Sequence, residues 1–146
     1  MTTVDKRTQF QPRDGNVYKL RRDFDCTVEP LTAADVIQLF DIPKGTLVLG
    51  LGLKVITPEG DTATATFGDT DADGFDASAD LNATALTETW NGFASVPTIS
   101  SEGAISPAYG LGHFYSADDT ITMTMGHTCD TAKFSVTVVC IPVFNS

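Results

Sequence analysis

The ten residues from Leu47 to Ile56 read LVLGLGLKVI, and they decide the fold class of this 146-residue chain. Every odd position from 47 to 55 holds a branched apolar side chain, whereas the even positions include Gly50, Gly52 and Lys54. Successive side chains of a strand point to opposite faces, so this period of two predicts a β-strand whose odd face lies in a hydrophobic core. The two glycines share the other face, where a missing side chain lets another backbone or a partner come close.

The same period recurs on both sides of this strand. Residues 18–28 predict a half-solvated edge strand, and residues 133–143, apolar on both faces toward their end, predict a central strand. Further strands are expected at 62–67, 86–93 and 120–125. Because the turn residues Pro58–Asp61 separate the strands at 47–56 and 62–67, these two are expected to form a hairpin. We expect polar loop at 68–84 and an extended loop or insertion at 95–112.

The segment from Leu31 to Ile42 allows two interpretations. Thr32 and Asp35 resemble a capping box, and the apolar residues that follow fit one face of a helix. We favour a turn at 32–35 and a buried strand from Val36 to Ile42, because Pro43, Lys44 and Gly45 then supply a turn into the next strand. With hardly any helix and about seven or eight short strands, the expected fold is all-β, an antiparallel β-sandwich of jelly-roll type with an N-terminal arm.

Charge is distributed unevenly along the chain. The net charge is −10, yet residues 1–22 hold six basic and two acidic residues, a net of +4, and the other three basic and seventeen acidic residues leave −14. We therefore divide the chain into an extended basic arm, 1–16, and a single sandwich domain, 17–146. An acidic body repels nucleic acid and membrane surfaces, whereas basic residues near the N-terminus can steer toward an acidic partner. The six basic residues are Lys6, Arg7, Arg13, Lys19, Arg21 and Arg22.

Three cysteines and the N-terminal composition indicate the compartment. The first fifteen residues lack the apolar core of a secretory signal. Cys26 and Cys140 fall on the apolar faces of their expected strands, so they are interpreted as small buried hydrophobic residues in a reducing compartment, without a structural disulfide.

One acidic segment has the spacing of a calcium loop. Asp69, Asp71 and Asp73 precede Gly74, and Asp80 occupies the twelfth position. The alternative is an Asp/Gly turn that binds no cofactor, which we favour because Asp80 replaces the usual glutamate and no helices flank the loop. No positioned nucleophile, base or metal set is evident elsewhere, so the chain is not expected to be an enzyme.

Aromatic residues gather in and around the irregular region. Such side chains provide large contact areas at small entropic cost, so they can form a carbohydrate or protein contact. The favoured alternative is that they close the ends of the sandwich. Together with the two strand glycines they are the candidates for contact between subunits: Gly50, Gly52, Trp90, Tyr109, Phe114 and Tyr115.

Three stretches resemble small virion proteins of tailed bacteriophages. They are DVIQLFDIPKGTLVLGLGLKVITPEGDTATATFGDTDADGF at 35–75, AYGLGHFYSADDTITMTM at 108–125 and TAKFSVTVV at 131–139. Those proteins are similar to capsid decoration, or cement, proteins with a jelly-roll-like β-sandwich. The resemblance covers about two-thirds of the chain and carries no active-site residues.

This resemblance implies a structural virion protein, made in the host cytoplasm, that binds the outer surface of a phage head and stabilises the shell. Its expected partners are the major capsid protein and further copies of itself, as a trimer before a dimer, with no nucleic acid and no membrane. The alternative function is a receptor- or glycan-binding module of a head fibre or tail, because aromatic residues lie near expected loops.

Overall fold

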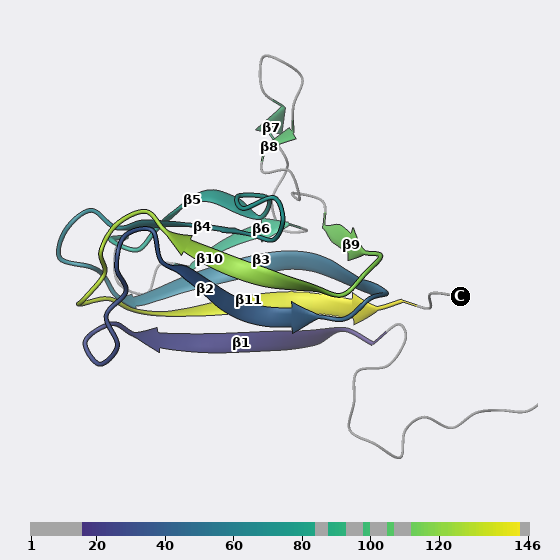
Figure 1. Ribbon diagram of the computed structural model, residues 1–146, viewed down its shortest axis with the longest axis horizontal. Helices are drawn as coiled ribbons and strands as arrows, with labels where there is room; N and C mark the ends of the chain where they lie inside the picture. The colour runs from purple at the N-terminus through teal and green to yellow at the C-terminus, as the bar shows by residue number, and fades with distance from the viewer. Residues whose placement is uncertain (1–15, 84–87, 93–97, 100–104, 107–111, 144–146) are drawn as a thin grey trace, which may run out of the picture.

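The computed structural model describes residues 16–83, 88–92, 98–99, 105–106 and 112–143 (Figure 1). Its strands, in chain order, are β1 (Tyr18–Asp25), β2 (Val36–Ile42), β3 (Thr46–Thr57), β4 (Thr64–Gly68), β5 (Asp76–Asp80), β6 (Glu88–Gly92), β7 (Thr98–Ile99), β8 (Ile105–Ser106), β9 (His113–Tyr115), β10 (Asp119–Met125) and β11 (Lys133–Pro142). Over these described ranges, no helix has the length and apolarity needed to cross a membrane.

Two antiparallel sheets pack face to face. Sheet I has the order β1-β11-β3-β6, with β9 also paired to β3, and sheet II has the order β2-β10-β4-β5. The short strands β7 and β8 pair with each other. Apolar side chains between the sheets form one core, and its large, fully buried members include Leu51, Phe67, Phe75, Ile121, Met123 and Phe134. The predicted all-β antiparallel sandwich is confirmed.

The strand order is that of a jelly roll. The pairs β4–β5, β3–β6, β2–β10 and β1–β11 are the successive rungs of one long antiparallel ribbon that is folded at the β4–β5 turn. Rolling this ribbon up brings β11 against β3 and β10 against β4, which closes the two sheets. The roll therefore places the edge strands β1 and β2 at the same margin of the sandwich (Figure 1).

The period of β3 breaks at a β-bulge. Val139 of β11 pairs with Gly50 and Cys140 pairs with Val48, so Leu49 is an extra residue in the ladder. Val48 is fully buried, whereas Leu47 and Leu49 are only half-buried. The expected single odd core face is therefore wrong before the bulge and right after it, where Leu51, Leu53 and Val55 are buried.

The expected hairpin between the strands at 47–56 and 62–67 is also wrong. β3 belongs to sheet I and β4 to sheet II, so the connection crosses from one sheet to the other. A strand has only two edges, and those of β3 are taken by β11 on one side and by β6 and β9 on the other. Backbone hydrogen bonds from Glu59 to Leu81 (2.9 Å) and from Leu81 to Ala63 (2.9 Å) fix the crossing.

The ambiguous segment forms the favoured strand. β2 spans Val36–Ile42, after a turn in which the Thr32 amide donates to Asp35 Oδ2 at 2.8 Å. Leu39 is the extra residue of a second bulge, because Ile121 pairs with Phe40 and Thr122 with Gln38. Leu39 and Phe40 are consequently both buried, although they are adjacent in sequence.

The positions of β1 and β11 in sheet I follow the prediction, but the end of β1 does not. β1 lies at the edge and β11 at the centre, between β1 and β3. The expected edge strand ends earlier than residue 28, because β1 stops at Asp25 and Val28 is 80% exposed in the following connection. Cys26 and Cys140 are fully buried as predicted, Cys129 is buried as well, and all three thiols are free.

One strand lies where only polar loop was expected. β5 spans Asp76–Asp80, and its polar residues alternate with two alanines. Phe75, Ala79 and Leu81 are buried, so the strand has a core face despite its polar composition. In the region expected to be irregular, 95–112, the described residues form the β7–β8 pair and Gly112.

Candidate functional site

The three described basic residues near the N-terminus lie on both faces of β1. Lys19 and Arg21 lie on the outer face of β1, and Arg21 Nε is 2.8 Å from Asp23 Oδ1. Arg22 lies on the opposite face, where its guanidinium donates to the Gln38 carbonyl of β2. The same guanidinium stands 5.2 Å from the ring centroid of Phe24. Arg22 thus bridges the two sheets at their open margin, leaving Lys19 and Arg21 as the outward-facing cations of β1.

The other predicted arm residues are Lys6, Arg7 and Arg13, and they lie outside the described residues. Their role in docking stays a prediction.

The structure separates the candidates for subunit contact. Gly50 and Gly52 are buried in the middle of sheet I, opposite Val139 and Thr137 of β11. On the other side, the backbone of Gly52 pairs with that of Trp90 on β6. These are in-plane partners within sheet I, and the role of the two glycines in subunit contact stays a prediction. Tyr109 lies outside the described residues.

Two neighbouring aromatic residues on β9 point in opposite directions. The Tyr115 side chain is buried, and its hydroxyl donates to Asp69 Oδ2 at 2.7 Å. His113 packs edge-on against the Tyr115 ring, with 4.6 Å between the centroids. Phe114 is 43% exposed on the outer face of sheet I. Tyr115 thus serves this chain's own core, while Phe114 is available at the surface.

The four aspartates of the predicted calcium loop are not brought together. Asp69, Asp71 and Asp73 lie in the turn that follows β4, whereas Asp80 pairs with Thr64 at the far end of the β4–β5 hairpin. At roughly 3.3 Å per strand residue, that is about 13 Å from the turn. Within the described residues, no group of three or more His, Cys, Asp or Glu side chains is arranged to hold a metal ion.

Asp69 also has a structural role in the turn. Its side chain is 2% exposed, Oδ1 accepts the Asp71 amide at 3.0 Å, and Oδ2 accepts the Tyr115 hydroxyl. A hydrogen bond with Asp73, burial, and the Asp73 and Asp69 charges raise the pKa of Asp71. Crowded carboxylates of this kind repel one another. The favoured interpretation, an Asp/Gly turn without a cation, stays a prediction, with calcium as the alternative.

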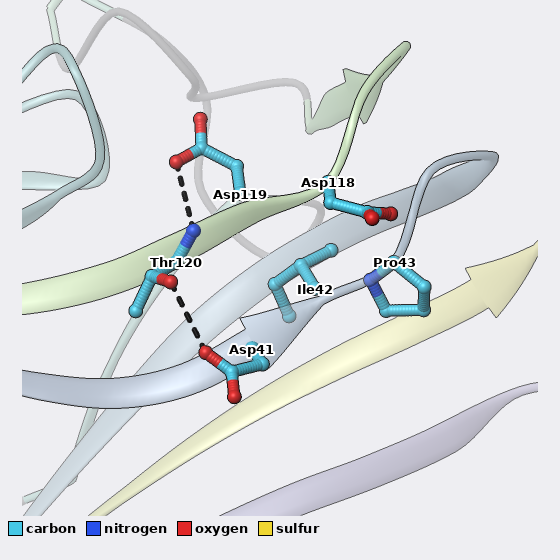
Figure 2. Close-up of a pocket in the computed structure, with 6 residues that line it drawn as sticks. All are labelled: Asp41, Ile42, Pro43, Asp118, Asp119 and Thr120. Carbon is cyan, nitrogen blue, oxygen red and sulfur yellow. Dashed lines mark hydrogen bonds between the residues drawn. The ribbon is translucent and has the colours of Figure 1, made fainter.

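A hollow of about 420 Å³ lies beside the Pro43 turn, and its lining is acidic (Figure 2). Thr120 donates from its hydroxyl to Asp41 (3.1 Å) and from its amide to Asp119 (2.8 Å). Asp118 accepts the Lys44 amide at 2.8 Å. These three carboxylates accept hydrogen bonds from neighbouring turn and strand residues, so local structure accounts for the acidic lining of the hollow.

A buried carboxylate that the sequence reasoning missed joins two sheet crossings. Glu59 is 6% exposed in the β3–β4 connection, and its Oε2 accepts backbone amides of the β10–β11 connection. The distances are 3.1 Å to Asp130, 2.9 Å to Thr131 and 3.0 Å to Ala132, and the Cys129 thiol also donates, at 3.2 Å. The Pro-Glu-Gly-Asp turn looked solvated in the sequence, and nothing in it signals this burial.

The charge of Glu59 is retained because it is so well hydrogen-bonded. Burial alone would raise the pKa of Glu59, but hydrogen bonds from Thr131, Cys129 and Ala132 outweigh burial and lower the pKa to about 2. Burial, together with the neighbouring Cys26 thiol and the Glu59 carboxylate, raises the pKa of Cys129. Burial likewise raises the pKa of Cys140 to about 11. The thiols are therefore protonated at neutral pH and poor nucleophiles.

The fold is shared with chains of phage capsids. A chain of the capsid of Ralstonia phage GP4 matches with a TM-score of 0.60 and 14% identity, covering 100% of this chain and 92% of that one. A chain of the acid-stable capsid of Helicobacter pylori bacteriophage KHP30 has a TM-score of 0.56 and 14% identity, covering 89% and 90%. A chain of the cyanophage Pam1 capsid has a TM-score of 0.53 and 16% identity, covering 97% and 98%.

No protein-family model matches the chain, and none of the curated proteins matches it in sequence. At identities of this size, the three capsid structures establish the fold alone.

Proposed function

We propose that this chain is a capsid decoration, or cement, protein of a tailed bacteriophage. It binds the outer surface of the head and stabilises the shell, without catalysis and without a cofactor. The observation that carries the proposal is the near-complete coverage in both directions of the matches to phage capsid chains, for example 100% of this chain and 92% of the GP4 chain. The shared fold extends over most of each matched capsid chain, as expected for a structural component of a capsid.

Charge supports a docking role. An acidic body of net charge −14 follows a basic segment of net charge +4, and Lys19 and Arg21 of that segment are exposed on the outer face of β1. A basic segment on an acidic body orients the molecule toward an acidic surface during encounter. In this proposal the surface belongs to the major capsid protein, and the protein is made in the host cytoplasm before it joins the virion.

Self-association belongs to the same proposal. Shells repeat their subunits around symmetry axes, so a small closed oligomer can place equivalent contacts on several shell subunits at once. Linked contacts of this kind increase the strength of binding well beyond that of one copy. We favour a trimer, with a dimer as the second choice.

Binding to purified capsids tests the role of the arm. Neutralising Lys6, Arg7 and Arg13 to alanine, or deleting residues 2–16, should lower the occupancy measured by co-sedimentation. The matched control neutralises Lys54 and Lys133, which lie in the acidic body toward the opposite end of sheet I from residue 17 and should leave the occupancy unchanged. A salt series separates charge steering from apolar contact, because exposed charges are screened. Undiminished binding of the arm variants would remove the role assigned to the arm.

A second candidate function is a receptor- or glycan-binding module of a head fibre or tail. The exposed Phe114 ring favours it, because exposed aromatic side chains suit such contacts. Copy number separates the two functions: a recognition module occurs in a few copies at the tail or the vertices, whereas a cement protein covers the shell.

A further inference from the structure

One end of sheet I carries an apolar row on its outer face. Phe114 of β9 pairs with Leu47 of β3, and Leu47 pairs with Ile141 of β11. Cross-strand partners project to the same face of a sheet. Residues adjacent to these three, Tyr115, Val48 and Cys140, are buried in the core, so the row itself points outward.

Two valines extend this row. Val17 immediately precedes β1, whose first residue pairs with Cys140, so Val17 lies beside Ile141. Val143 follows β11, and its amide donates to the Gly45 carbonyl at 2.7 Å. We call the five residues the apolar end patch: Val17, Leu47, Phe114, Ile141 and Val143.

The exposure of the patch is unusual for this chain. Val17 is 58% exposed, Phe114 43% and Val143 41%, while Leu47 and Ile141 are half-buried. The other large apolar residues that are exposed in the described part are Val28, Val36 and Ile56, and they are dispersed over a connection, sheet II and sheet I. Only the end patch forms a continuous cross-strand row among them, and contiguous exposed apolar surface marks a contact site.

Basic residues adjoin the apolar end patch on the same face. Lys19 pairs with Val139, one outward position along β11 from Ile141, and Arg21 follows at the next outward position of β1. The basic arm also joins the sandwich here, because residue 16 leads directly into Val17.

We infer that the apolar end patch, with Lys19 and Arg21 at its rim, is the face that seats on the shell. The partner it fits is a shell surface with an apolar centre and acidic side chains around it. Arg21 is paired with Asp23, so Lys19 carries most of the positive charge at the rim. A two-fold contact between copies through this patch would bring the Lys19 side chains of both copies around one apolar centre, so charge favours the shell over a second copy. This assignment rests on the proposed function and adds to it the surface through which the chain docks.

Two valine substitutions of the full chain test the assignment. Val143→Asp places a carboxylate in the patch, and Val36→Asp places the same group on β2 at the opposite end of the sandwich, where Val36 is 62% exposed. Co-sedimentation with purified capsids gives occupancy, analytical ultracentrifugation gives the oligomeric state, and circular dichroism melting gives folding. Phe114→Asp is the second patch variant, used if Val143→Asp fails to fold.

We expect the patch variants to need at least tenfold more protein than the natural chain for half-occupancy of the shell. Val36→Asp should bind the shell as well as the natural chain does, and all variants should keep the oligomeric state of the natural chain. Equal binding by the patch variants and the natural chain overturns the assignment. Dissociation of the oligomer by the patch variants also overturns it, because the patch then lies between copies. If the natural chain itself does not bind capsids, the proposed function fails first.

Discussion

Glutamine at position 59 should destabilise the fold and alter its response to acid. Glu59 Oε2 accepts three backbone amides and one thiol, at 2.9–3.2 Å. The pKa falls from the ordinary 4.5 to about 2, and one pKa unit corresponds to about 1.4 kcal/mol. The ionised side chain therefore contributes on the order of 3 kcal/mol to the free energy of unfolding.

The direction of the pH dependence follows from the lowered pKa. Because the folded state binds this proton more weakly than the unfolded state, the contribution is fully present above about pH 5. It is lost as the pH falls from about 4.5 toward about 2. Glutamine keeps one acceptor oxygen but loses the charge, and charge-assisted hydrogen bonds are about twice as strong as neutral ones. We expect Glu59→Gln to lose about 2 kcal/mol at pH 7, which is roughly 4–8 °C in Tm.

Urea denaturation followed by circular dichroism measures both effects. At pH 7 the midpoint of Glu59→Gln should fall, and between pH 5 and pH 3 the natural chain should lose more stability than the variant. Glu29→Gln is the matched control, since Glu29 is exposed in the β1–β2 connection. A Glu59→Gln chain as stable as the natural chain at pH 7, with the same loss in acid, would refute the reasoning.

Three further changes test the turns. Ala34 has φ of +73°, so Ala34→Gly should relieve about 1 kcal/mol of backbone strain, partly offset by the greater freedom of the unfolded chain. We expect the variant to raise Tm by a few degrees in a thermal melt. A lower Tm contradicts this. A Cβ at Gly68 would lie 1.9 Å from the Asp71 carbonyl oxygen, so Gly68→Ala should lose about 2 kcal/mol or more in urea denaturation, and an unchanged midpoint would be inconsistent with the turn. Calcium binding in the Asp69–Asp73 turn predicts a higher Tm at millimolar calcium that Asp71→Asn abolishes, whereas an unchanged Tm in the natural chain rejects the ion.

Period-two patterns predicted the fold class because burial on one face is recorded directly in the sequence. The central position of β11 followed from its apolar residues on both faces, and the edge position of β1 followed from its charged outer face. β5 could have been sought in the same way, since the odd positions Phe75, Ala79 and Leu81, in and beside it, are apolar and buried. Its aspartates were instead interpreted as ligands or turn residues.

Features that depend on tertiary partners left no such record. The bulge at Leu49 shifts the core face of β3 through its register with β11, and no residue type marks that shift. The β3–β4 connection crosses between sheets because the edges of β3 are taken by strands far away in sequence. Glu59 looked like an exposed turn residue, although its four donors come from the β10–β11 connection. The apolar end patch likewise forms only when β3, β9 and β11 are paired.

Imaging of purified phage heads that have been incubated with the full chain tests the proposed function most directly. The proposal predicts jelly-roll density repeated over the outer surface of the shell, with the end of sheet I that carries Phe114 turned toward the shell subunits. Shells without added density, or density confined to the tail or a few vertices, would contradict a role as a decoration protein.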